Sequence, residues 1–250
     1  GQQADIVFFF SFQEIYKCAQ CEDELGAAYR KLVINRSDIL ELAHDKWKMQ
    51  QRLKSEGLGD LVIPSVIEGD YAAISALWGP MFLLKPRTSY ASKGIHIVRN
   101  AKEFDFYRES MGEGFMAQQL IGDDEHEYTV GVFGLGDGSH AGMIQMQRKL
   151  SQEGSTAKAS TLADVQLEEA VNRICRVLKP VGPTNMQFRY HDGGYKLLEV
   201  NPRISSSTSI RAAFGYNEAR MSIDFLLMGC VVVPELRSGS AQRFIDDYVS

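Results

Sequence analysis

The stretch YKLLEVNPRISSSTS, residues 195–209, decides the fold because it ends an apolar strand with polar side chains. Successive side chains of a β-strand point to opposite faces, so Glu199 and Asn201 are predicted to share one face with Leu197. The rise along a strand places Glu199 and Asn201 about 7 Å apart. A proline then ends the hydrogen-bonded ladder, and Arg203 follows it. This stretch therefore predicts a carboxylate, an amide and a guanidinium at one strand end.

The residues before this strand complete a hairpin, NMQFRYHDGGYKLLEVNP, around an Asp-Gly-Gly turn. A three-residue loop would pair His191 with Tyr195 and, counting back, Gln187 with Glu199. The side chains of Gln187, Glu199 and Asn201 would then form one oxygen-bearing surface, and Mg²⁺ prefers oxygen ligands. The alternative is the solvent-facing polar side of an ordinary half-buried sheet.

The composition is that of an ordinary globular protein, with 250 residues, 44% hydrophobic and 24% charged. The formal net charge of −5 argues against a general nucleic-acid binder, which would present a basic surface. The longest apolar runs, IVFFF at 6–10 and FLLMGCVVV at 225–233, fall short of the ~20 residues that span a bilayer. We therefore expect a cytoplasmic protein that does not insert into a membrane.

The sequence contains four cysteines, and Cys18 and Cys21 form a CxxC pair. A zinc site would need a second pair of ligands at a suitable spacing, and the sequence has none. A redox motif would open a helix after a strand, whereas this pair lies inside a helix-like pattern. We interpret both cysteines as structural.

The order of hydrophobic patterns predicts an α+β fold. Residues 1–36 read as the remnant of an N-terminal α/β domain, with strands at ADIVFFFS and RKLVIN around a helix. A helix is then predicted from Ser37, its N-cap, to Gly57, its stop. Further strands are predicted at IPSVI, MFLLKP, GIHIVRN, FMAQQLI, EYTVGVFG and SHAGMIQMQRK, and further helices at DYAAISALWG, 105–111, 163–178 and about 216–228.

A second polar element follows the strand MFLLKP. Lys85 ends this apolar strand, where an unpaired ammonium group would be unfavourable. The loop 88–94 that follows is rich in small and hydroxyl residues, and such loops can offer backbone N–H groups to phosphates. No Walker A sequence is present. The alternative is a β-hairpin with a lysine whose head group extends into solvent.

A third polar element is FMAQQLIGDDEHEYTVGVFG, residues 115–134, in which an acidic turn joins two strands. The DDEHE turn reads as a solvated loop. Glu127 differs from the rest of the turn because it opens the second strand.

This order of elements resembles an ATP-grasp domain, most closely that of the carbamoyl phosphate synthase large subunit. The resemblance covers about residues 37–250 and is most specific in GPTNMQFRYHDGGYKLLEVNPRISSSTSIRAAFG. It implies an ATP-grasp fold of two α+β subdomains that clasp ATP, at about 37–118 and 119–250. The remnant at 1–36 would belong to the domain that precedes ATP-grasp domains in such proteins.

The resemblance also implies roles for individual residues. Lys46 and Lys85 would hold ATP phosphates, under a lid formed by loop 88–94. The nucleotide set is Lys46, Lys85, Ser89, Ser92, Lys93, Gly94, Gln118, Gln119, Leu120 and Glu127. Within it, the strand 116–120, MAQQL, would be the hinge whose backbone contacts adenine, and Glu127 would bind the ribose. The metal set is Gln187, Glu199 and Asn201, and the residues nearest the transferred phosphate are Arg148, Asn201 and Arg203.

The implied activity is that of a carboxylate–amine ligase that uses ATP and Mg²⁺ (or Mn²⁺) and forms an acyl phosphate. Its partners would be a small-molecule carboxylate, such as an amino acid, and an amine, and we allow for a homodimer. The predicted substrate ligands are Lys158, Arg203 and Arg211. The alternative for Lys158 is an ordinary surface lysine, and the alternative for Arg211 is a surface arginine at the start of a helix.

Three departures argue against carbamoyl phosphate synthesis by this chain alone. The segment SQEGSTAKAS lacks the histidine that the synthase uses for bicarbonate, Ser206 stands where the synthase has a second arginine, and the sequence contains one ATP-grasp unit rather than two. The alternatives to a ligase are an ATP-binding sensor or assembly module without turnover and a subunit like that of the synthase.

Overall fold

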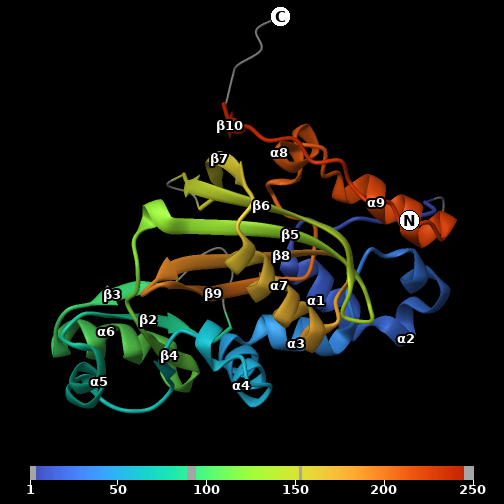
Figure 1. The fold of residues 1–250 in the computed structure, drawn as a ribbon. Helices are drawn as coiled ribbons and strands as arrows, with labels where there is room; N and C mark the ends of the chain where they lie inside the picture. Colours follow the sequence, from blue (N-terminus) through green and yellow to red (C-terminus); the bar gives the residue numbers. More distant parts are fainter. Residues whose placement is uncertain (1–3, 89–93, 152–153, 245–250) are drawn as a thin grey trace, which may run out of the picture.

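The fold consists of two separate antiparallel sheets and the helices that pack on them (Figure 1). A computed structural model describes residues 4–88, 94–151 and 154–244. The α+β class that the sequence predicts is confirmed. Within the described residues, no helix is both long enough and apolar enough to cross a membrane.

The smaller sheet has four strands in the order β1-β4-β2-β3. These strands are β1 Ser65–Val66, β4 Phe115–Gln119, β2 Phe82–Pro86 and β3 His96–Val98. Two helices, α5 Tyr71–Trp78 and α6 Ala101–Met111, pack on one face, where the aromatic rings of Phe82, Phe104 and Phe115 are buried. Helix α6 begins four residues before the predicted start, because Asn100 accepts a hydrogen bond from the backbone N–H of Glu103 and caps the helix there.

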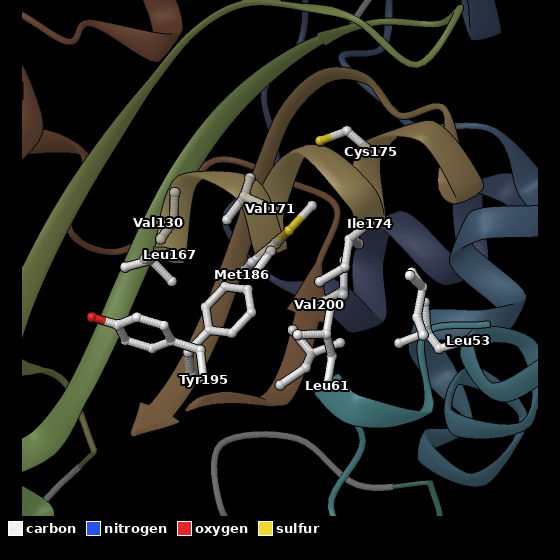
Figure 2. Close-up of a cluster of buried hydrophobic side chains, with 14 of the residues drawn as sticks. Leu53, Leu61, Val130, Leu167, Val171, Ile174, Cys175, Met186, Tyr195 and Val200 are labelled. Carbon is white, nitrogen blue, oxygen red and sulfur yellow. The ribbon is translucent and has the colours of Figure 1, made fainter. Parts of the chain in front are cut away.

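The larger sheet has six strands in the order β10-β7-β6-β5-β8-β9. Its strands are β5 Glu127–Leu135, β6 His140–Leu150, β7 Thr156–Leu162, β8 Val181–His191, β9 Gly194–Asn201 and β10 Ser240–Gln242. One face is covered by α7 Val165–Leu178, which buries Leu167, Val171 and Ile174 against Val130, Met186 and Val200 (Figure 2). The other face packs against α8 Thr208–Ala213 and α9 Glu218–Met228.

The predicted helix from Ser37 is two helices, α3 Ser37–His44 and α4 Lys46–Ser55. The break occurs at Asp45, whose carboxylate accepts hydrogen bonds from the backbone N–H groups of the next turn and starts a new helix. Helix α4 contributes Met49 and Leu53 to the core of the six-stranded sheet rather than to that of the four-stranded sheet.

The N-terminal segment forms less regular structure than predicted. It contains α1 Phe12–Gln20, α2 Glu22–Leu25 and the 3₁₀ helix η1 Gly26–Lys31; the other 3₁₀ turns are η2 Gly59–Leu61, η3 Gly112–Gly114 and η4 Asp124–His126. The two predicted strands meet only in one parallel bridge between Val7 and Leu32. Strands β7 and β10 were not predicted, because neither carries an apolar run.

Candidate active site

The hairpin of β8 and β9 turns in two residues rather than three. Asp192 and Gly193 have φ angles of 49° and 77°, and His191 lies opposite Gly194. Positive φ at both central residues is typical of two-residue turns whose twist matches that of the paired strands. The predicted three-residue loop, with His191 opposite Tyr195, is therefore wrong.

The predicted pairing of Gln187 with Glu199 is nevertheless present. A β-bulge follows Gln187, because Phe188 pairs with Leu197 and Leu198 is the extra residue on β9. The bulge compensates for the shorter turn. It also places Leu197 in the buried core, so the prediction that Leu197 shares a face with Glu199 is wrong.

A row of polar side chains crosses the face on which Glu199 lies. Asn201 donates a hydrogen bond from Nδ2 to Glu199 Oε1 over 2.6 Å. On the neighbouring strands, Arg148 Nη2 donates to Gln187 Oε1 over 2.6 Å and to Glu127 Oε1 over 2.7 Å. The structure therefore brings the three predicted metal ligands, Arg148 and Glu127 onto one face of the sheet.

Glu127 is buried between two guanidinium groups. Arg148 Nε also donates to Oε1 over 3.1 Å, and Arg189 Nη2 donates to Oε2 over 2.9 Å. A carboxylate offers about four lone-pair positions, so these three hydrogen bonds leave about one for a ligand. Sequence analysis missed Arg189, although its spacing of two residues from Gln187 puts it on the same strand face.

Lys85 brings a buried cation to this region from the smaller sheet. Its side chain is 6% exposed, and Nζ donates to Gln118 Oε1 over 2.7 Å. Burial, assisted by the positive charge of Lys46, lowers the pKa of Lys85 to about 7, and Glu199 opposes this shift. A buried amine with this pKa changes its charge readily when an anion arrives.

Lys46 is positioned by the helix start at Asp45. The Asp45 carboxylate caps α4 and forms an ion pair with Arg87 over 2.6 Å, and the backbone N–H of Lys46 donates to the Arg87 carbonyl over 3.1 Å. Burial lowers the pKa of Lys46, while the negative charges of Glu199 and Asp45 oppose the shift. Lys46, Lys85 and Glu199 therefore lie close enough to interact electrostatically.

Arg203 adds a third cation next to Glu199. Its backbone N–H donates to the Asn201 carbonyl over 2.8 Å, and its guanidinium donates to the Ile204 carbonyl over 2.8 Å. Burial lowers the pKa of Arg203, and Glu199 and Glu218 oppose this effect.

The combination of cations and oxygen donors suits a polyphosphate with a hard metal ion. Mg²⁺ is usually held by one or two carboxylates, substrate phosphates and water, so Glu199 with two amide oxygens is a chemically suitable donor set. No group of three or more His, Cys, Asp and Glu side chains suited to a metal occurs in the part of the chain that the structure describes. A dedicated all-protein metal cage is therefore not formed by those residues.

The predicted hinge, residues 116–120, is formed by β4 from Met116 onward and by Leu120. Gln118 is buried, accepts from Lys85 and donates from Nε2 to Ser65 Oγ over 3.0 Å. The backbone N–H of Gln119 donates to the Pro64 carbonyl over 2.9 Å, and Leu120 follows the strand. The hinge thus contains Gln118, the residue that holds the Lys85 ammonium group.

Lys158 does not join the other predicted site residues. It is exposed on β7 and pairs with Lys149, the neighbour of Arg148 on β6. Because neighbouring residues of a strand point to opposite faces, Lys158 lies on the face opposite to Arg148. This register argues against the predicted role of Lys158 as a substrate ligand.

Arg211 is also unsuited to the role predicted for it. Its side chain is completely buried, and it donates to Glu218 Oε1 over 2.6 Å, to Thr129 Oγ1 over 3.0 Å and to Asn185 Oδ1. A Cβ atom on Gly131 would lie 2.6 Å from the guanidinium, so only glycine leaves room for it. No surface remains for a substrate carboxylate, and we assign Arg211 a structural role.

The predicted lid is only partly described. Gly94 lies in an exposed turn with a φ of 74°, a conformation that favours glycine. Ser89, Ser92 and Lys93 lie outside the described residues.

Comparison with known proteins identifies the family. A family profile described as "ATP-grasp in the biosynthetic pathway with Ter operon" matches residues 116–244, more than half of the chain. The chain belongs to the ATP-grasp family. The matched range includes every residue of the polar row from Glu127 to Asn201.

Curated relatives are large chains of carbamoyl phosphate synthase. That of Methanosarcina mazei is 39% identical over 162 residues, which cover 58% of this chain and 15% of the relative. That of Methanoculleus marisnigri is 44% identical over 57 residues, which cover 22% of this chain and 5% of the relative. The chain thus matches only a small part of the length of these relatives.

Solved structures confirm the ATP-grasp fold. Biotin carboxylase from Campylobacter jejuni superposes with a TM-score of 0.76 at 17% identity, covering 96% of this chain and 58% of that protein. N5-carboxyaminoimidazole ribonucleotide synthetase from Thermotoga maritima gives a TM-score of 0.69 at 16% identity, covering 94% of this chain and 62% of that protein.

Proposed function

We propose that the protein binds ATP with Mg²⁺ (or Mn²⁺) and joins a carboxylate to an amine through an acyl phosphate. The observation that carries this proposal is the convergence of Lys46 and Lys85 with Glu199, from two different sheets and α4. Similar solved structures include a biotin carboxylase domain in complex with MgADP and bicarbonate and an N5-carboxyaminoimidazole synthetase in complex with ADP.

In this proposal the nucleotide lies between the two sheets. Lys46 and Lys85 hold the phosphates, and the negative charge of the polyphosphate returns Lys85 to its protonated form. The hinge 116–120 contacts adenine through its backbone, and Glu127 accepts a hydrogen bond from one ribose hydroxyl at its remaining lone pair. Ser89, Ser92, Lys93 and Gly94 contribute the lid.

Gln187, Glu199 and Asn201 would hold the metal ion, which neutralises charge on the phosphates when it is bound. Arg148 keeps the Gln187 amide and the Glu127 carboxylate in fixed orientations, since it donates hydrogen bonds to both. We therefore propose a positioning role for Arg148 in place of direct contact with the transferred phosphate.

The proposed reaction has two steps. A substrate carboxylate oxygen attacks the γ-phosphorus atom, and ADP leaves with the electrons of the broken P–O bond. The amine then attacks the acyl carbon, inorganic phosphate leaves, and the amine loses a proton. We propose that Arg203 binds the substrate carboxylate or the transferred phosphate. Exclusion of water protects the acyl phosphate from hydrolysis.

We further propose that about residues 37–118 and 119–250 form the two ATP-grasp subdomains and that the protein acts in the cytoplasm on small molecules. The separate sheets support this division, although α4 packs with the larger sheet. The N-terminal 36 residues would adjoin the active-site wall.

The test is phosphate release from ATP and Mg²⁺ in the presence of pools of amino acids and other carboxylic acids, with and without amines. We expect release that depends on one pool and is lost in Glu199→Gln, while Glu168→Gln, an exposed change on α7, keeps it. Unchanged turnover in Glu199→Gln would remove the metal assignment. ATP binding by calorimetry without release in any pool would favour an ATP sensor.

A further inference from the structure

A run of exposed apolar side chains lies at the end of α9 and on the segment that follows it. Seven large apolar side chains within eleven residues are between 40% and 72% exposed. They are Leu226, Leu227, Met228, Val231, Val232, Val233 and Leu236, which we call the α9 patch. Figure 1 shows this segment running from α9 past α8 to β10.

The α9 patch is presented on a fixed backbone. A Cβ atom on Gly142 would lie 2.7 Å from Pro234, and one on Gly215 would lie 2.0 Å from the Glu235 carbonyl oxygen. The backbone N–H of Arg237 donates to the Phe214 carbonyl over 2.9 Å. Because these contacts hold the inner side of the segment, the exposed valines need little ordering before they bind a partner.

The backbone beside the exposed valines is also available. Among the described residues, Val231, Val232 and Val233 form no backbone hydrogen bond. Exposed β-branched residues with free N–H and C=O groups can pair with a strand of another chain. Main-chain pairing of this kind is a common way in which proteins recognise extended segments.

The size of the α9 patch is appropriate for the centre of a dimer interface. Seven half-exposed apolar side chains present on the order of 500 Å² of apolar surface, within the roughly 300–600 Å² of the largest patch on a monomer, which is often functional. A stable interface buries about 800 Å² on each partner, with an apolar centre and a polar rim. The patch supplies such a centre, and neighbouring polar residues supply a rim.

We propose that the α9 patch is a two-fold interface with a second copy of this chain, in which the two Val231–Val233 segments pair as antiparallel strands. Identical antiparallel strands satisfy a two-fold axis, because each residue meets its counterpart reciprocally. The stretch 225–234 has no charged residue, so two copies meet without repulsion at the centre. At its edges, Asp224 is paired with Arg220, and Glu235 is followed by Arg237.

The helical part of the α9 patch begins away from the candidate active site. Glu218, next to Arg203, begins α9, and the patch starts eight residues later, about 12 Å along the helix. Dimer formation and ligase activity are therefore separable, and the inference does not depend on the proposed function.

The test is the molar mass of the protein by analytical ultracentrifugation over a range of micromolar concentrations. We expect the unaltered chain to be a dimer and the double variant Val231→Glu, Val233→Glu to bind itself at least about 100-fold more weakly, since each charge is buried twice in the interface. The matched control is Val165→Glu at the start of α7, where the valine is 80% exposed outside the patch.

Circular dichroism and thermal unfolding of each variant establish that the fold is retained. Loss of the dimer in the double variant alone supports the proposal. A monomer at every concentration for the unaltered chain overturns it and would indicate that another partner covers the patch. A dimer that survives the double variant as well as the control also overturns it, because the interface then lies elsewhere.

Discussion

Replacement of Lys85 by methionine should stabilise the ligand-free protein near pH 7 while removing a proposed phosphate ligand. The pKa of Lys85 falls from 10.5 to about 7 on folding, because burial disfavours the charged form. At about 1.4 kcal/mol per pH unit, protonation of this one amine stabilises the unfolded state relative to the folded state by about 4 kcal/mol at pH 7. Methionine has a similar shape and carries no charge.

The opposing term is the lost hydrogen bond to Gln118, which leaves a buried amide oxygen without a donor and costs about 1–3 kcal/mol. The net effect at pH 7 is a gain of about 1–3 kcal/mol for Lys85→Met. Because Lys85 binds a proton more strongly in the unfolded state between pH 7 and 10.5, the contribution of Lys85 to the stability of the wild type rises with pH over that range. At pH 10 the free-energy cost of burying Lys85 falls to about 1 kcal/mol. The stability difference between Lys85→Met and the wild type should therefore vanish or reverse at pH 10.

Urea unfolding of both proteins at pH 7, 8.5 and 10 measures this difference. Lys102→Met, at an exposed position of α6, is the control and should show the same difference at every pH. The same Lys85→Met protein should bind ATP at least about tenfold more weakly, by loss of one charge-assisted contact. A stability difference that is identical at pH 7 and pH 10 would refute the reasoning about the buried amine.

Three further outcomes are expected. Gly131→Ala should destabilise the fold by about 1–3 kcal/mol in urea unfolding, because its Cβ atom would lie 2.6 Å from the buried Arg211 guanidinium; an effect below about 1 kcal/mol would contradict this packing. Burial raises the pKa of Cys175 to about 12, so a thiol reagent at pH 8 should modify it only after unfolding. Burial opposes ionisation of Asp45, but hydrogen bonds from Arg87 and from the start of α4 hold the pKa of Asp45 below its usual range. Asp45→Asn should therefore lower the free energy of unfolding most above about pH 5, and progressively less as the pH falls.

Local patterns were sufficient to predict most of the strands that build the site. Apolar runs that end in a polar residue located β2 with Lys85 and β9 with Glu199, because burial and side-chain alternation act within a few residues. The pairing of Gln187 with Glu199 was also predicted, although the turn assumed for it was wrong. The turn is one residue shorter than predicted and the bulge adds one residue to β9, so the pairing of Gln187 with Glu199 is the same.

The features that were missed depend on contacts between distant segments. Nothing near Arg211 indicates that its guanidinium fills the space above Gly131, 80 residues earlier in the sequence. Strand β7 has a polar sequence, with no apolar run that would predict a strand. It is a strand because it pairs with β6 on one side and β10 on the other. The break at Asp45 was hidden because the residues on both sides favour helix, and it is fixed by Arg87, which directly follows β2.

The bulge at Leu198 has a practical consequence for engineering this hairpin. Four further residue pairs separate the Gln187–Glu199 pair from the tip, where the Asp192 side chain is 85% exposed. A short flexible peptide or a fluorescent label inserted at residues 192–193 should therefore leave the oxygen donors undisturbed, since loop extensions at exposed tips are well tolerated. Such a handle would allow immobilisation or distance measurements on the working protein.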